Sequence, residues 1–215
     1  MSLITIKSLV EFQEDKLGMC RESIKIIAVS KLQPNERVES VLKVGHRVFG
    51  ENKVQEAINK WPEFKRKFDN VELHLLGPLQ RNKVRQAMQL FDFIHTVESI
   101  KLAQKIATIR DEIGFCPKIF IQVNTGRETQ KSGVNIEGLK ELLVTCRDLS
   151  LPVVGLMCIP PIQEDPDIHF SLLKSLKEKH GVTELSMGMS GDFEKAILAG
   201  ASYIRVGSAI FGERP

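Results

Sequence analysis

Lys31 directly follows an apolar segment, "IKIIAVS" at residues 24–30, that has the composition of a buried β-strand. Alternate side chains of a strand point to opposite faces, so Ile27, Val29 and Lys31 are expected to share one face. An amine at the end of such a strand can act as a Schiff-base nucleophile toward a carbonyl group. A single lysine at a strand end more often extends into solvent. Lys31 therefore indicates chemistry only if other residues accompany it.

Two small-residue segments near the end of the sequence are suited to a phosphate group. Ser190 and Gly191 lie in a turn before a helical segment, and Gly207 and Ser208 follow the last apolar segment. Backbone N–H groups at a helix start, with a hydroxyl beside them, favour a phosphate dianion. The alternative is that Ser190 is an ordinary helix N-cap and that Asp192 complements the helix dipole.

Arg205 lies in the last apolar segment, where alternation places Tyr203, Arg205 and Gly207 on one face. An arginine that faces the interior needs an anion or a hydrogen-bond acceptor, although a structural ion pair would also satisfy it. A phosphate cradle, an inward arginine and a lysine able to form a Schiff base together suggest pyridoxal 5′-phosphate (PLP) as a cofactor. The aldehyde of PLP would then lie next to the amine of Lys31.

Eight short apolar segments alternate with segments of helical spacing along the chain. This alternation predicts parallel strands joined by helical crossovers. We therefore expect an α/β fold, a single (β/α)8 TIM barrel with an extra N-terminal helix through Leu17, as one PLP-binding domain over residues 1–215. An open doubly wound sheet is the alternative. Loops after the seventh and eighth strands of such barrels commonly bind phosphate. The apolar segments are residues 24–30, 46–50, 72–77, 91–97, 118–124, 152–159, 184–188 and 201–207.

The ends of several helices can be placed from single residues. Asn135 and Ser190 stand where helix N-caps belong, and Gly114 follows a helical segment. Trp61 and Pro62 indicate the end of the helix after the second strand, because proline disrupts a helix interior.

The composition is typical of a folded globular protein. Hydrophobic residues make up 42% of the 215 residues and charged residues 27%, with a net charge of +3. No dense Lys/Arg block occurs, so nucleic acid is not expected as a partner, and the positive excess would suit a small anionic ligand. The five histidines lack metal-ligand spacing, so no metal site is expected.

Sequence features also indicate the cellular compartment. The four cysteines stand far apart without a CxxC pair, which is typical of reduced thiols. Glu11, Glu14 and Asp15 interrupt the N-terminal segment where a signal peptide needs a continuous apolar core. No later window approaches transmembrane length. We expect a cytoplasmic protein without a membrane partner.

Six ordered motifs span nearly the whole chain. They are "AVSKLQP", "FGENKVQE", "HLLGPLQRNK", "IQVNTGRETQKSG", "GLMCIPP" and "LSMGMSGDFEKAILAGASYIRVGSAIFG". With these motifs the sequence resembles the pyridoxal phosphate homeostasis proteins, also called the YggS or PROSC family, whose fold is that of the N-terminal barrel of alanine racemase. The resemblance implies a barrel that holds PLP.

The resemblance also implies roles for single residues. Lys31 would carry PLP as an internal aldimine, and Arg205 would lie near the pyridine nitrogen. A guanidinium cannot accept a proton, so that nitrogen should stay unprotonated and the ring should be a weak electron sink. The family's phosphate-binding positions are matched by Ser190, Gly191, Gly207 and Ser208.

Further residues near strand ends are candidates to line the site. Asn52 is preferred over His74, because a histidine in an apolar segment is often a satisfied core residue. Lys53 departs from the family pattern, which has an aromatic residue, usually tyrosine, at this position. Glu128 and Lys131 follow the fifth strand and either line the mouth, where Lys131 could receive or relay the cofactor, or belong to a solvated loop.

Three functions agree with these observations. The first is a non-enzymatic PLP carrier in intracellular PLP homeostasis, with apo PLP-dependent enzymes as further partners. The resemblance favours a monomer, and the chain is expected to hold no second domain. The second is a PLP-dependent amino-acid racemase of the alanine racemase type, which needs acid–base groups on both faces of the cofactor. The single tyrosine, Tyr203, is badly placed for that role. The third is a lyase that uses Lys31 directly on a sugar phosphate, which the family motifs argue against.

Overall fold

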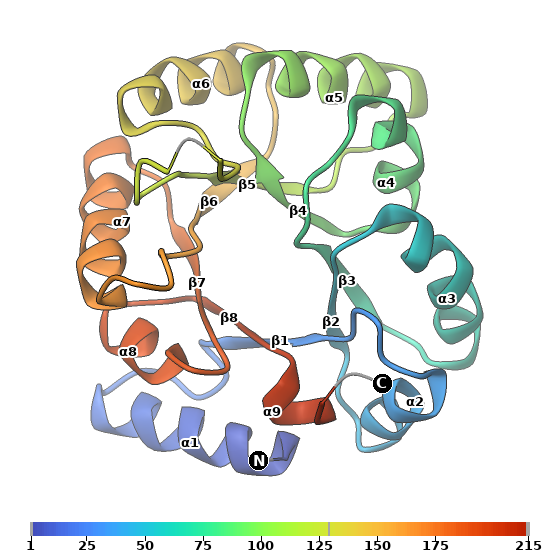
Figure 1. The fold of residues 1–215 in the computed structure, drawn as a ribbon. Coiled ribbons are helices and arrows are strands. Elements are labelled where there is room, and N and C mark those ends of the chain that lie inside the picture. The colour runs from blue at the N-terminus through green and yellow to red at the C-terminus, as the bar shows by residue number, and fades with distance from the viewer. Residues whose placement is uncertain (1, 129, 214–215) are drawn as a thin grey trace.

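A closed ring of eight parallel strands forms the centre of the molecule (Figure 1). The structure is a computed structural model that describes residues 2–128 and 130–213. The strands are β1 Lys25–Val29, β2 Val48–Glu51, β3 Glu72–Leu75, β4 Phe93–Val97, β5 Lys118–Gln122, β6 Val153–Met157, β7 Glu184–Met189 and β8 Tyr203–Val206. Each strand pairs with the next in sequence, and β8 pairs with β1. The predicted (β/α)8 barrel is confirmed, and the open-sheet alternative is wrong.

The helices form an outer layer around the strands (Figure 1). They are α1 Leu3–Lys16, α2 Asn35–Lys43, α3 Val54–Lys67, the short 3₁₀ helix η1 Arg81–Lys83, α4 Val84–Leu90, α5 Ile100–Ile113, α6 Ile136–Asp148, α7 Pro166–His180, α8 Phe193–Leu198 and α9 Ser208–Phe211. The first helix precedes β1 and packs against α8 and α9. The extra N-terminal helix is therefore confirmed, with Leu17 as its C-cap.

The main hydrophobic core lies between the strands and the surrounding helices. Ile26 and Ala28 of β1 belong to it, together with buried side chains of the helices. Ile27 lies on the other face, inside the barrel, where an added Cβ on Gly50 would clash with it. The predicted alternation along β1 is confirmed. A second apolar cluster inside the barrel consists of Phe93, Phe120 and Met157, with Val154 and Tyr203 packed against it.

Two helix ends differ from the sequence predictions. α3 continues through Pro62 to Lys67, although proline in a helix interior costs about 3 kcal/mol. The fully buried Trp61 holds this part of the helix against the barrel, so tertiary packing outweighs the local signal. Ser190 is not an N-cap, because α8 begins at Phe193 with Asp192 in that position.

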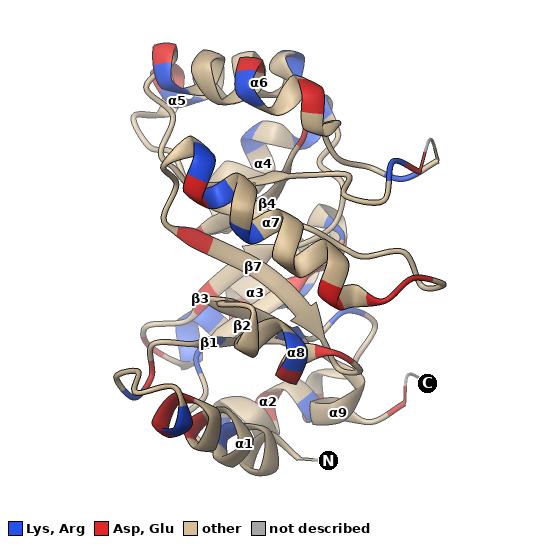
Figure 2. Cartoon of the chain, turned by 90° about the vertical axis from the view of Figure 1, so that its left-hand side faces the viewer, with Lys and Arg blue, Asp and Glu red and all other residues tan. Residues whose placement is uncertain are grey.

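The carboxyl ends of the strands face one end of the barrel. The arrowhead of β7 in Figure 2 points to the side on which α9 and the C-terminus lie. Acidic and basic segments are interspersed along the helices in this view, without a continuous stripe of one sign. Over residues 2–128 and 130–213, no helix combines the length and apolar character needed to cross a bilayer.

Glu14 ties the outer helix α1 to the start of the barrel. Glu14 is 1% exposed, and its carboxylate accepts hydrogen bonds from the N–H of Glu22 at 3.1 Å and of Ile24 at 2.8 Å. The hydroxyl of Ser23 donates to the same carboxylate at 3.2 Å. One carboxylate therefore satisfies three donors in the segment that leads into β1.

Glu14→Gln is predicted to lower the free energy of unfolding by about 1–3 kcal/mol, because the amide offers one acceptor oxygen where the carboxylate offers two. Glu11→Gln changes the same charge at an exposed position of the same helix and should leave stability unchanged within error. Urea denaturation of both variants measures the difference. Equal losses would show that charge, and not the buried hydrogen bonds, is responsible.

Candidate functional site

A cavity of about 290 Å³ opens at the carboxyl ends of β1, β7 and β8. All the residues that the sequence analysis assigned to cofactor binding line it. Four apolar residues complete the lining described here, namely Val29, Leu76, Ile159 and Met189. The predicted residues are Lys31, Asn52, Ser190, Gly191, Arg205, Gly207 and Ser208.

The pairing of β1 with β8 brings the two ends of the sequence together at this cavity. Ile27 lies opposite Arg205 in the register of the two strands. Beyond the strands, an added Cβ on Gly207 would lie 3.3 Å from the Val29 carbonyl oxygen, so a glycine allows this close approach. The Gly207 N–H donates to Ser190 Oγ at 3.2 Å, which joins the loops after β7 and β8.

Arg205 is held in a fixed orientation at the wall of the cavity. Its Nη1 donates to Ser186 Oγ and its Nη2 donates to the Cys158 carbonyl oxygen, both at 2.8 Å. Arg205 is only 5% exposed, and burial lowers the pKa of its guanidinium. A guanidinium nevertheless stays protonated in proteins. The cavity therefore has a fixed cation in its wall, as the inward-facing arginine of the sequence analysis predicts.

Lys31 lies in a tight turn that follows β1. The strand ends at Val29, two residues before Lys31, and the Gln33 N–H donates to the Ser30 carbonyl oxygen at 3.1 Å to close the turn. Leu32 has a φ of 59°, a left-handed conformation that costs a residue with a side chain roughly 1–2 kcal/mol. Such a conformation persists only where its surroundings fix it.

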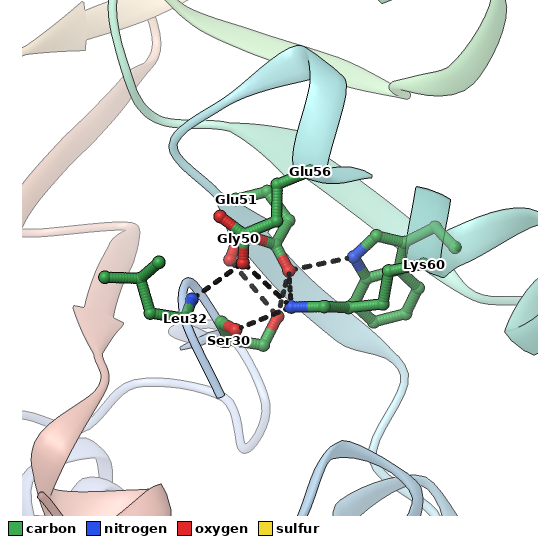
Figure 3. Close-up of polar contacts among 7 residues, drawn as sticks. Ser30, Leu32, Gly50, Glu51, Glu56 and Lys60 are labelled. Atoms are coloured by element: carbon green, nitrogen blue, oxygen red, sulfur yellow. Dashed lines mark hydrogen bonds and ion pairs between the residues drawn. The ribbon is translucent and has the colours of Figure 1, made fainter. Parts of the chain in front are cut away.

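Both peptide groups that flank Lys31 are held by side chains of α3 (Figure 3). Lys60 Nζ donates to the Ser30 carbonyl oxygen at 3.0 Å, and the Leu32 N–H donates to Glu56 Oε1 at 2.7 Å. Lys60 and Glu56 also pair with each other at 3.0 Å, one helical turn apart. An ion pair on α3 therefore fixes the main chain at Lys31.

Glu51, the last residue of β2, is the buried centre of these contacts (Figure 3). Its Oε1 accepts hydrogen bonds from Ser30 Oγ at 2.8 Å, from Lys60 Nζ at 3.0 Å and from Trp61 Nε1 at 3.0 Å. The Glu51 side chain is fully buried and that of Lys60 is 8% exposed. Burial raises the pKa of the Glu51 carboxyl, and Lys60 opposes this rise. The ammonium thus compensates a carboxylate that would otherwise be costly to bury.

Other residues singled out from the sequence lie away from this cavity. His74 is fully buried inside the barrel and is hydrogen-bonded to Glu72 and His95. Glu128 and Lys131 form an ion pair at 2.6 Å and line a separate cavity after β5, so they do not join Lys31. Lys53 is exposed at the start of α3 and is not among the lining residues. In the part of the chain described, no group of three or more acidic, histidine or cysteine side chains is arranged to hold a metal ion.

Sequence reasoning missed the residues that hold the turn at Lys31. Glu56 and Lys60 have the i, i+4 spacing of an ordinary surface pair on a helix. Nothing in that spacing shows that the pair faces the turn after β1. Glu51 stands in the "FGEN" motif and could have been noticed as an acid in an otherwise apolar strand.

Comparison with known proteins identifies the family of the chain. The model of the alanine racemase N-terminal domain matches residues 18–215. A pyridoxal phosphate homeostasis protein of Vibrio alginolyticus is 39% identical over 97% of this chain and 94% of its own length. Its counterpart in Escherichia coli K12 is 33% identical over 99% of this chain and 95% of its own length. The chain belongs to the pyridoxal phosphate homeostasis protein family.

Solved structures agree with this membership. PipY of Synechococcus elongatus PCC7942, solved with PLP bound, has a TM-score of 0.82 and 35% identity over 95% of this chain and 100% of that chain. Its structure without PLP has a TM-score of 0.84. An alanine racemase of Clostridium difficile 630 has a TM-score of 0.70 at 17% identity, over 97% of this chain and 57% of that chain, and so shares the fold.

Lys60→Met is predicted to lower the free energy of unfolding by about 3–5 kcal/mol, because it leaves the Glu51 carboxylate buried without its cation. Adding Glu51→Gln should restore part of this loss, since the double variant buries no unpaired charge. Lys67→Met, on the same helix with an exposed partner, is the matched control and should unfold like the parent protein. Urea denaturation measures all four proteins. A double variant no more stable than Lys60→Met would contradict the proposed compensation.

Proposed function

We propose that this chain binds PLP in the cavity at the carboxyl ends of β1, β7 and β8, and that it acts in PLP homeostasis without turning over a substrate. The observation that carries the proposal is the convergence of Lys31, Arg205 and two small-residue loops on one cavity. The lining found among the described residues contains no acidic side chain. A lysine and an arginine in this lining favour an anionic ligand. The family membership and the PLP-bound structure of PipY support PLP as this ligand.

Lys31 is assigned to the aldehyde of PLP. Its Nζ would add to the aldehyde carbon, and one water would leave as the C=N bond of a Schiff base forms. When bound, PLP supplies the carbonyl group that this chemistry requires. Because Glu56 and Lys60 fix the peptide groups on both sides of Lys31, its side chain leaves from a fixed backbone position, and little backbone freedom is lost on binding.

The phosphate group is assigned to the loops after β7 and β8. The bond between the Gly207 N–H and Ser190 Oγ keeps these loops adjacent. Glycine and serine leave the backbone accessible to a ligand, and Arg205 and Lys31 supply positive charge to the same cavity. The residues assigned to the phosphate are Ser190, Gly191, Gly207 and Ser208.

The pyridine ring is assigned to the remaining wall of the cavity. Arg205 would donate to the ring nitrogen, and as a donor it would leave that nitrogen unprotonated. Leu76 and Ile159 offer apolar surface for the ring, and Asn52 offers a polar group at its edge. An arginine in this position holds the ring without making it a strong electron sink.

Apo forms of PLP-dependent enzymes are proposed as recipients of the cofactor, and the carrier is proposed to act as a monomer. A Schiff base is reversible in water, so the bond that retains PLP also permits its release. Met189 and Ile159, at the rim of the cavity, are 37% and 38% exposed, so the site is reached from outside the barrel.

An amino-acid racemase is the second candidate, and the structure gives it little support. Such an enzyme needs an acid–base group on each face of the cofactor. Tyr203, the single tyrosine, packs inside the barrel against Phe93 and Phe120 and does not line the cavity. Burial also raises the pKa of Tyr203 to about 12, which makes it a poor base at neutral pH.

The Schiff base predicts a covalent label on one residue. We expect the protein mixed with PLP to show a visible absorption band, and borohydride to fix the cofactor to the peptide that contains Lys31. Lys31→Ala should lack both the band and the label. Lys53→Ala, which removes an exposed amine that is not among the lining residues, should keep both and serves as the control. A label on another lysine in the parent protein would refute the assignment.

Turnover distinguishes a carrier from a racemase. The PLP-loaded protein is expected to leave L-alanine and D-alanine optically unchanged, whereas ordinary enzymes turn over about 1–1000 times per second. Chiral chromatography after overnight incubation, with an alanine racemase as the positive control, measures inversion of these and other amino acids. Sustained inversion that Lys31→Ala abolishes would replace the carrier proposal with a racemase.

A further inference from the structure

A chain of polar side chains crosses the interior of the barrel from Arg205 to the amino end of β3. Arg205 Nη1 donates to Ser186 Oγ at 2.8 Å, and Ser186 Oγ lies 2.9 Å from His95 Nδ1. His95 Nε2 lies 2.8 Å from His74 Nδ1, and His74 Nε2 lies 2.9 Å from Glu72 Oε1. The two histidines and Ser186 are fully buried, whereas the Glu72 side chain is 37% exposed.

Burial favours the neutral form of both histidines, and ring stacking holds them in place. Burial lowers the pKa of His74, although Glu72 opposes this, and lowers the pKa of His95 well below its ordinary value. His74 stacks on Phe93 with ring centroids 4.4 Å apart, and His95 stacks on Phe120 at 4.3 Å. These stacks fix the planes of the imidazoles, so each ring nitrogen keeps its partner.

With neutral histidines, only one arrangement of hydrogen atoms gives every hydrogen bond in this series a donor and an acceptor. The Glu72 carboxylate only accepts, so His74 Nε2 carries a proton and donates to it. His74 Nδ1 then accepts from His95 Nε2–H, and His95 Nδ1 accepts from the Ser186 hydroxyl. The Ser186 oxygen accepts in turn from Arg205, which only donates. Arg205 at one end and Glu72 at the other therefore require the same donor-to-acceptor direction for every hydrogen bond between them.

The series of hydrogen bonds links Arg205 to the Glu72 carboxylate, in addition to Asp192, whose charge raises the pKa of the guanidinium. Within residues 2–128 and 130–213, Arg205 forms no ion pair with a carboxylate, although it is only 5% exposed. A buried cation without compensation is costly. Hydrogen bonds in series polarise one another in a low-dielectric interior. The Glu72 carboxylate can therefore stabilise the guanidinium through three neutral groups.

We propose that Glu72, His74, His95 and Ser186 form a relay that positions Arg205 for the pyridine ring of PLP. The relay and the Cys158 carbonyl hold one side of the guanidinium, which leaves its remaining N–H groups for the ligand. The four relay residues are positioning residues, since none of them lines the cavity described. The inference rests on the proposed function, because it assigns the relay to the same site.

The relay can be tested first without PLP. In protein with ¹⁵N-labelled histidine, we expect His74 and His95 to give Nε2–H tautomers, assigned with His74→Gln and His95→Gln. Glu72→Gln should move the ring signals of both. Glu184→Gln is the matched control, because Glu184 also lies at the amino end of a strand and its charge, like that of Glu72, raises the pKa of Tyr203. Imidazolium or Nδ1–H signals in the parent protein, or equal responses to both variants, would overturn the relay.

The second measurement is the affinity for PLP, which is determined by titration from the absorption of the bound cofactor. Ser186→Ala, which removes the hydroxyl next to Arg205, is expected to weaken binding about tenfold, the effect of one lost hydrogen bond in a buried site. Glu72→Gln, which removes the charge at the far end of the series, should weaken binding about threefold because it polarises the hydrogen bonds less. Glu184→Gln should bind like the parent. Thermal unfolding verifies that each variant is folded. If Ser186→Ala does not fold, the partly exposed Glu72→Gln decides the test.

The possible results separate the relay from the proposed function. A parent protein that binds PLP through Lys31, with Ser186→Ala and Glu72→Gln binding equally well, would refute the relay and leave the proposed function intact. A parent protein that binds no PLP would refute both. Weaker binding of Ser186→Ala and Glu72→Gln, together with an unchanged Glu184→Gln, is the result that supports the relay.

Discussion

The candidate site depends on the pairing of β1 with β8, which closes the barrel. In this register Ile27 lies opposite Arg205, and the turn that carries Lys31 follows β1 beside the loop that begins at Gly207. A register shift of one residue would move the side chain of Arg205 from the inner face to the outer face. Closure also leaves no unpaired strand edge in the sheet. The same hydrogen bonds thus complete the fold and bring together residues from opposite ends of the sequence.

Closure alone does not fix Lys31, which lies beyond the end of β1. Its position depends on Glu56 and Lys60, which bind the peptide groups on either side of it, and on Glu51 beneath them. A buried ion pair contributes little net stability, because the cost of desolvating the charges offsets their attraction. Its contribution here is therefore geometric: it holds the left-handed conformation of Leu32 and sets the direction in which the lysine leaves the turn.

The barrel and the location of the cavity follow from local features of the sequence. Alternation along β1 and β8 places Lys31 and Arg205 correctly, because strand geometry relates neighbouring residues by a simple rule. The supporting contacts do not follow from such rules. Glu56 and Lys60 have an ordinary helical spacing, and only the docking of α3 shows what they face. Pro62 gave a wrong helix end because packing of the adjacent Trp61 outweighed a local preference.

The interior of the barrel holds two histidines in fixed positions behind Arg205. One apolar cluster, with Phe93 and Phe120, supports two imidazoles that burial keeps neutral. A histidine acts as a general acid or base only if it can change its protonation state near neutral pH. His74 and His95 are instead fixed as oriented dipoles between a carboxylate and a guanidinium. An interior of this kind maintains one geometry and one charge distribution next to Arg205.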